Sequence, residues 1–164
     1  FHVKNINDME TVKILEDFKS DVIITFGTRK IKDPLLSLFD GININLHGGD
    51  PENYRGLDSH LWAIYHGDWS SLVTTLHIVN RDLDCGDIIE KKPVDLSKTR
   101  DLYSLRAANT VNCVEISLLA LDYYKKHRYF KLAAQMQKGR YYSFMPACLK
   151  EICAKKFSNY VRLK

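Results

Sequence analysis

The sequence predicts an α/β fold: a Rossmann-like, doubly wound domain on a mainly parallel sheet, followed by a long helix and a C-terminal β-hairpin and helix. Strand-like apolar runs alternate with helical segments in the first hundred residues, as is typical of parallel strands joined by helical crossovers. Only three or four parallel strands are predicted before the alternation ends, so we expect the N-terminal strands of the doubly wound domain to be missing. We divide the chain into a core over residues 1–128 and an extension over residues 129–164.

The opening segments predict a strand, a helix and a second strand. Residues 1–5 have the character of a short strand, and Asn7 with Glu10 forms a capping box that opens a helix to about residue 19. The run 22–26 is continuously apolar, which indicates a strand covered on both faces.

A short helix and a strand follow. Asp33-Pro34 starts a helix over 35–39, because proline favours the first helical position, and Gly41 ends it. Residues 42–47 alternate in polarity as a strand does, and residues 48–51 form a loop rich in glycine.

The middle of the chain continues the alternation. Residues 57–66 predict a helix that ends at Gly67. Residues 72–79 predict a strand, 81–87 a polar loop, and 88–93 another strand.

A long helix is predicted over residues 100–127, with Ser97 as its cap. It has two apolar stripes, which predict burial between the sheet and a second element, either the C-terminal segment or another subunit. The stripes are Leu102, Leu105, Ala108, Ile116, Leu119 and Tyr123, and Ala107, Val111, Val114, Leu118 and Leu121. After it, residues 133–144 predict a hairpin and 146–157 a last helix.

Composition excludes several classes of protein. The 164 residues with 45% hydrophobic content suit one globular domain. No apolar run approaches the roughly 20 residues that cross a bilayer, and no secretory leader is visible, so we expect a cytoplasmic protein. The net charge is +4, and the basic last forty residues suit either a solvated surface or a nucleic-acid partner, with the solvated surface favoured on charge alone.

The four cysteines lack a CxxC pair, which favours free thiols in a reducing compartment, although a Cys148–Cys153 disulfide stays open. The histidines lack the spacing of metal ligands, so we expect no metal.

Three polar residues carry the predicted chemistry. Asn45 and His47 alternate at a strand end, and Asp84 reaches the same edge of the sheet if the strand before it is parallel. An amide, an imidazole and a carboxylate can donate to a developing oxyanion, move a proton and orient the group that moves it. Taken singly, each residue is explained as well by a loop contact or a turn.

The joint pattern of these motifs resembles the 10-formyltetrahydrofolate-dependent formyltransferase family. It consists of Asn45-Leu46-His47-Gly48-Gly49-Asp50-Pro51, Tyr54-Arg55-Gly56, Trp62-Ala63-Ile64, Thr74-Thr75-Leu76-His77 and Asp82-Leu83-Asp84-Cys85-Gly86-Asp87. The likeness covers roughly residues 5–121. Gly48-Gly49 after the histidine is closest to the nucleotide-sugar N-formyltransferases, because the methionyl-tRNA and glycinamide branches place proline there.

The resemblance implies a role for each site residue. Asn45 would bind the formyl oxygen, His47 would assist proton transfer, and Asp84 would hold the imidazole. The co-substrate 10-formyltetrahydrofolate would bind against Phe26, Gly27, Arg29, Lys30, Ile31, Val79, Asp82 and Leu83. The acceptor would bind against Gly48, Gly49, Asp50, Tyr54, Arg55, Tyr141 and Tyr142.

The resemblance also implies an activity and a partner. We expect formyl transfer to a dTDP- or UDP-linked 4-amino- or 3-amino-6-deoxyhexose, as used in O-antigen or other glycan biosynthesis, by a homodimer that binds neither nucleic acid nor membrane. The alternative within the family is phosphoribosylglycinamide formyltransferase. The alternative from another class is a non-catalytic module that binds nucleic acid through the basic tail.

Overall fold

The computed structural model describes residues 1–39 and 42–163 and has a mixed α/β fold, which confirms the predicted fold class. Its main sheet has four strands in the order β1-β2-β4-β5, which comprise Ile23–Phe26, Asn43–His47, Val73–Ile78 and Ile88–Pro93. A second sheet pairs β3, Tyr54–Gly56, with β6, Arg140–Tyr142.

The directions of the strands decide where the loops emerge. The β1–β2 and β3–β6 ladders are parallel, as predicted for the sheet as a whole, whereas β4 runs antiparallel to both β2 and β5. The loop after β4 therefore leaves the sheet at the edge opposite to the end of β2. Asp84 reaches the end of β2 by another route, described below.

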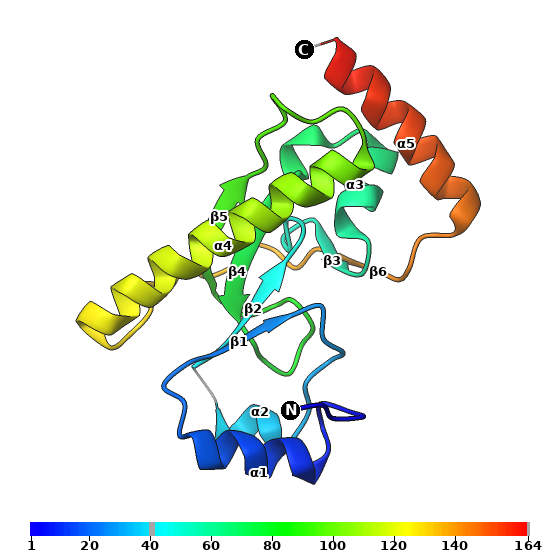
Figure 1. Ribbon diagram of the computed structural model, residues 1–164. Coiled ribbons are helices and arrows are strands. Elements are labelled where there is room, and N and C mark those ends of the chain that lie inside the picture. The colour runs from blue at the N-terminus through cyan, green and yellow to red at the C-terminus, as the bar shows by residue number, and fades with distance from the viewer. Residues whose placement is uncertain (40–41, 164) are drawn as a thin grey trace.

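The long helix crosses the main sheet, and the other helices lie in two groups at opposite ends of the molecule (Figure 1). The long helix α4, Leu102–His127, packs against β4 and β5, and its residues Ile116 and Ala120 share a buried cluster with Ile44 and Leu76. Helices α1, Met9–Phe18, and α2, Leu35–Leu38, form a cluster beside β1. At the other end, α5, Ala147–Arg162, packs on α3, Ser59–His66. The short 3-10 helix η1, Trp69–Ser71, follows α3 in the chain and also contacts it.

The N-terminal segment differs from its prediction. Residues 1–5 form no strand, and α1 begins after Asp8 without a side-chain cap. Asn7 does not close a capping box with Glu10, because its side chain bonds instead to the backbone of Lys30 and Lys32, at 3.0 and 2.7 Å. The predicted helix stop at Gly41 lies outside the described residues.

The start of α4 also differs from its prediction. The cap is Asp101 and not Ser97, because the Asp101 carboxylate accepts the Ser104 amide at 2.7 Å and the Ser104 hydroxyl bonds back to the Asp101 amide at 3.0 Å. This reciprocal pair satisfies two otherwise unpaired donors of the first turn.

The predicted C-terminal hairpin does not form. Residue Ala133 makes an isolated bridge to Ile88, and the chain then runs on to pair β6 with β3 in parallel. The two halves of the predicted hairpin therefore pair with different strands of the core. Gly139 fits at this crossing because a Cβ there would lie 2.4 Å from the Pro51 carbonyl oxygen. Helix α5 continues to Arg162, five residues beyond its predicted end.

One side of the sheet and of α4 faces outward. Strand β1 is an edge strand, and Ile24 and Phe26 are 38% and 58% exposed, so it is not covered on both faces as predicted. The second stripe of α4 is exposed as well, at Val111, Val114 and Leu118. The C-terminal segment leaves these residues exposed, although α5 packs on α3 and also contacts α4. No helix within the described part of the chain is both long and apolar enough to span a bilayer.

Candidate active site

A cavity of about 410 Å3 opens beside the end of β2, between the loops after β1 and β4 and the first turns of α3 and α4. Its walls carry the three predicted catalytic residues, Asn45, His47 and Asp84. The cavity also contains apolar surface from Phe26, Ile31 and Leu83, so it combines a polar centre with apolar walls.

The polar centre is built on one face of the main sheet. Asn45 stands opposite His77 across the β2–β4 ladder, and His47 stands opposite Thr75. Side chains of directly opposed residues share a face, so Asn45, His47 and His77 point to the same side.

Asp84 reaches this face because the loop after β4 folds back over the sheet. Its Oδ2 lies 3.6 Å from Nδ1 of His47, and its Oδ1 lies 3.5 Å from Nε2 of His77. Figure 1 shows this loop, in green, passing next to the ends of β1 and β2. Asp84 was expected to reach the site at the end of a parallel strand, whereas an antiparallel strand and the returning loop bring it there.

The position of Asp84 is held by its neighbours from several directions. Its backbone is left-handed, with φ +53°, a conformation that costs a non-glycine residue roughly 1–2 kcal/mol. Its Oδ2 accepts the Gly56 amide at 2.7 Å. The Gln135 side chain donates to the carbonyl oxygens of Asp84 and Gly86, at 3.0 and 2.8 Å. The C-terminal segment therefore fastens the loop from outside.

Both histidines are fixed by backbone carbonyls. Nε2 of His47 lies 2.8 Å from the Tyr54 carbonyl oxygen, and Nδ1 of His77 lies 2.8 Å from that of Ile78. Since a carbonyl oxygen only accepts, each of these ring nitrogens carries the hydrogen. The other ring nitrogen of each histidine faces the Asp84 carboxylate. The cluster can therefore take up one further proton between a ring nitrogen and the carboxylate.

Burial and charge set the protonation of this cluster. Burial lowers the pKa of His47 below its usual value, against the opposing effect of Asp84, so this imidazole is neutral at neutral pH. Burial alone would raise the pKa of Asp84, but its contact with His77, its electrostatic interaction with His47 and the hydrogen bond from the Gly56 amide together lower it. Asp84 is therefore ionised beside a neutral base.

Asn45 is oriented by two partners. Its Nδ2 donates to Nε2 of His77 over 3.2 Å, and its Oδ1 accepts from the Thr25 hydroxyl over 3.1 Å. One Nδ2 hydrogen is used by His77, and the second remains for a ligand in the cavity that Asn45 lines.

The structure places the predicted co-substrate residues together. All eight line the cavity: Phe26, Gly27, Arg29, Lys30, Ile31, Val79, Asp82 and Leu83. They come from the loop after β1 and the loop after β4, which lie on either side of Asn45.

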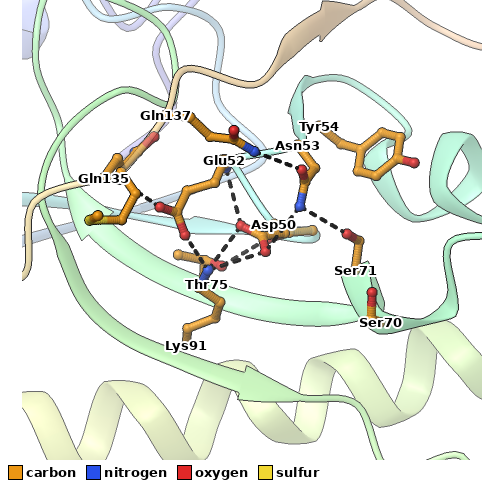
Figure 2. A network of polar contacts seen from close by, with 12 residues as sticks. Asp50, Glu52, Asn53, Tyr54, Ser70, Ser71, Thr75, Lys91, Gln135 and Gln137 are labelled. Atoms are coloured by element: carbon orange, nitrogen blue, oxygen red, sulfur yellow. Dashed lines mark hydrogen bonds and ion pairs between the residues drawn. The ribbon is translucent and has the colours of Figure 1, made fainter.

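The predicted acceptor residues are more scattered. Gly48 lines the cavity. Gly49 lies behind it, where a Cβ would be 3.3 Å from Nε2 of His47 and 2.7 Å from the Ser59 Cβ. Asp50 does not line the cavity, because its carboxylate is held by the Lys91 ammonium at 3.0 Å in the polar network of Figure 2.

The remaining acceptor residues also make contacts outside the cavity lining. Arg55 donates to the carbonyl oxygens of Gly139 and Leu83, at 2.6 and 3.0 Å, and so supports the Asp84 loop. Tyr142 stacks between aromatic neighbours, with its ring centroid 5.5 Å from that of Tyr54. Tyr141 is 52% exposed at the surface.

Several residues of the site were not singled out from the sequence. His77 belongs to the quoted motif, but only the antiparallel pairing of β2 with β4 shows that it faces Asn45. His60 and Asn109 line the cavity from α3 and α4. Gln135 has no sequence signal, since it acts across a separation of 51 residues. Within residues 1–39 and 42–163, no group of three His, Cys, Asp or Glu side chains could hold a metal ion.

Known proteins share both the sequence pattern and the fold. The chain is 30% identical over 99 residues to the bifunctional polymyxin resistance protein ArnA of Wigglesworthia glossinidia brevipalpis, covering 60% of the chain and 15% of that protein. It is 35% identical over 98 residues to methionyl-tRNA formyltransferase of Clostridium acetobutylicum, covering 58% of the chain and 31% of that protein. The chain thus spans less than a third of the length of these relatives.

Solved structures agree in fold. HypX from Aquifex aeolicus superposes with a TM-score of 0.71 and 23% identity, over 92% of this chain and 28% of that one. The formyltransferase PseJ from Anoxybacillus kamchatkensis, solved with UDP-4,6-dideoxy-4-formamido-L-AltNAc and tetrahydrofolate, gives 0.61 and 23%, over 85% of this chain and 83% of that one. The family described as formyl transferase matches residues 1–118, which contain the whole polar centre. The chain therefore belongs to the formyl transferase family.

Proposed function

We propose that this protein transfers a formyl group from 10-formyltetrahydrofolate to the amino group of a nucleotide-linked amino sugar, a dTDP- or UDP-linked 4-amino- or 3-amino-6-deoxyhexose. The observation that carries the proposal is the convergence of Asn45, His47 and Asp84 in the wall of one cavity. Membership of the formyl transferase family supports the reaction class.

The cavity suits a folate. A pterin is flat, with polar edges, and Phe26, Ile31 and Leu83 give the cavity apolar walls next to the backbone of the loop after β1. Phe26 is 58% exposed, so its ring is free to contact a bound heterocycle. When bound, 10-formyltetrahydrofolate supplies an electrophilic formyl carbon.

The residues of the polar centre would then perform three tasks. The free Nδ2 hydrogen of Asn45 would donate to the formyl oxygen as negative charge develops there. Nδ1 of His47, neutral and without a hydrogen, would accept the proton that the attacking amine loses. Asp84, ionised and 3.6 Å away, would stabilise the imidazolium that forms. His77 would hold Asn45 in its orientation.

Charge in the cavity favours an anionic acceptor. Arg29 and Arg106 line the cavity, and neither has a carboxylate partner in the described part of the chain. Of the acidic lining residues, Asp58 and Asp82 are paired with lysines, and Asp84 lies against His47 and His77. Two unpaired guanidinium groups suit a diphosphate, which the nucleotide-linked sugar carries.

The likeness to PseJ supports the same acceptor class, since that protein was solved with a UDP-linked formamido sugar. Gly48-Gly49 after His47 is also typical of the sugar branch. We further propose a cytoplasmic location, in keeping with the four free cysteines.

The test is a direct transfer assay. The protein is incubated with 10-formyltetrahydrofolate and, in parallel, with dTDP- and UDP-linked amino sugars, glycinamide ribonucleotide and methionyl-tRNA, and formylated products are identified by mass. We expect product with an amino sugar. Product with glycinamide ribonucleotide or methionyl-tRNA alone would overturn the acceptor assignment. Absence of any product, together with tight nucleic-acid binding that weakens steeply with salt, would overturn the reaction class.

A further inference from the structure

His60 places one bound and one free ring nitrogen in the cavity wall. Its Nε2 lies 2.7 Å from the Val73 carbonyl oxygen, so Nε2 carries the hydrogen and Nδ1 has only a lone pair. His60 lines the cavity. A Cβ built on Gly48 would lie 3.8 Å from Nδ1, so this nitrogen stands beside the loop that follows His47.

His60 remains neutral under ordinary conditions. Burial lowers its pKa to about 4, against the hydrogen bond to Val73, and the electrostatic interaction with the neighbouring His47 ring lowers it further. Its protonation state and its tautomer are therefore both fixed. Nδ1 is a hydrogen-bond acceptor and a weak base, so it can receive a hydrogen bond but does not carry a proton between reactants.

His60 stands apart from the catalytic cluster. Its ring hydrogen bond goes to Val73, and it has no hydrogen bond to Asn45, His47 or Asp84 among the described residues. Asn109 lies next to it, with Nδ2 3.7 Å from the same position above Gly48 and Oδ1 held by the Thr74 hydroxyl at 2.7 Å. An acceptor atom and an amide donor thus flank Gly48, outside the group that handles the proton.

We propose that Nδ1 of His60 accepts a hydrogen bond from the amine acceptor, either from the reacting amino group or from a hydroxyl beside it, and so helps to select the acceptor. This inference rests on the proposed function. An unprotonated nitrogen with a fixed tautomer weakens the binding of a ligand that places a hydrogen-bond acceptor or an anionic oxygen there. It strengthens the binding of a ligand that places an N–H or O–H group there.

Two variants separate this role from a structural one. His60→Asn places an amide oxygen where Nδ1 stands and loses the contact with Val73. His60→Gln places an amide nitrogen where Nε2 stands and loses the acceptor facing the cavity. We expect His60→Gln to raise KM for the acceptor about tenfold, the value of one hydrogen bond, with kcat and the donor KM within about twofold of the wild type. We expect His60→Asn to keep the acceptor KM within about threefold.

A purely structural role predicts the opposite order, with His60→Asn the impaired and less stable variant and His60→Gln close to the wild type. That order, or an unchanged KM in His60→Gln, would overturn the inference. Acceptors with and without the neighbouring hydroxyl identify the donor group, because the penalty of His60→Gln disappears with the deoxy acceptor only if the hydroxyl is the donor.

The assay also separates the two proposals. If the wild type formylates glycinamide ribonucleotide and not an amino sugar, the proposed acceptor is wrong, and the two variants are compared with that amine. If the wild type formylates none of the amines, both proposals fail.

Discussion

The side chain of Gln135 offers a direct test of how the Asp84 carboxylate is held. Its amide nitrogen donates to the carbonyl oxygens of Asp84 and Gly86, at 3.0 and 2.8 Å. Gln135→Ala removes both bonds without touching the cavity, since Gln135 does not line it. Asp84 keeps the Gly56 amide and the backbone of its own loop.

The expected fall in kcat for Gln135→Ala follows from these contacts. Two neutral hydrogen bonds contribute about 2 kcal/mol together. The left-handed backbone of Asp84, at φ +53°, costs roughly 1–2 kcal/mol, so loss of the bonds is enough to let the loop relax away from this conformation. Since about 1.4 kcal/mol corresponds to a tenfold change in rate, we expect kcat to fall between about fivefold and thirtyfold.

Steady-state kinetics of the purified variants would measure the effect. The matched control is Gln137→Ala, because Gln137 lies two residues further along the same segment and bonds to the Asn53 side chain and not to the loop. A second arm uses the Asp84→Ala background, where removal of Gln135 should have no further effect. A kcat for Gln135→Ala within twofold of the wild type, or an equal loss in the control, would refute the reasoning.

Further predictions concern the charge of the site, its pH dependence and its backbone. Asp84→Asn should lower kcat about 100-fold or more with little change in melting temperature, as measured by kinetics and thermal unfolding, because the amide cannot stabilise an imidazolium. Because the pKa of His47 is lowered, kcat should stay level from pH 8 to about pH 6.5 and fall only below it. Because the pKa of His60 is about 4 in the folded state, the unfolded chain binds more protons than the folded chain between about pH 6.5 and pH 4. The free energy of unfolding, measured by denaturant titration, should therefore fall by up to about 3 kcal/mol as the pH is lowered through this window. The fall should be smaller in His60→Gln. Gly86→Ala should destabilise the fold by about 3 kcal/mol in the same titration, because its Cβ would lie 1.8 Å from the Ile78 carbonyl oxygen, whereas Gly67→Ala, with no heavy atom near its Cβ, should cost less.

Local patterns were sufficient for elements whose ends depend on nearby residues. The strand over 88–93 has its predicted bounds, and α3 ends before Gly67, whose φ of +75° favours glycine. The strand over 73–78 was recognised from its residues, but its direction was not, because the pairing of β4 depends on contacts with β2 and β5. The hairpin was wrongly predicted for the same reason, since β6 pairs with a strand far away in the sequence.

The residues of the site also differ in whether the local sequence was sufficient to predict them. Asn45, His47 and Asp84 could be named from the joint motif and its resemblance to the formyltransferase family, and the structure brings them together. His77 could not, because its position relative to Asn45 depends on the register of β2 against β4. Gln135 lies in a segment without periodicity, and only the path of the folded chain reveals its contacts.

The fastening of the Asp84 loop by Gln135 has a practical consequence for where this protein can be divided. A boundary after residue 128 separates a core and an extension by sequence, yet hydrogen bonds around the polar centre join residues on both sides of it. A fragment shortened to that boundary would retain Asn45, His47 and Asp84 in its sequence and lose the Gln135 side chain that holds the Asp84 loop. Truncations intended to isolate the chemistry should therefore keep β6 and the residues that lead into it.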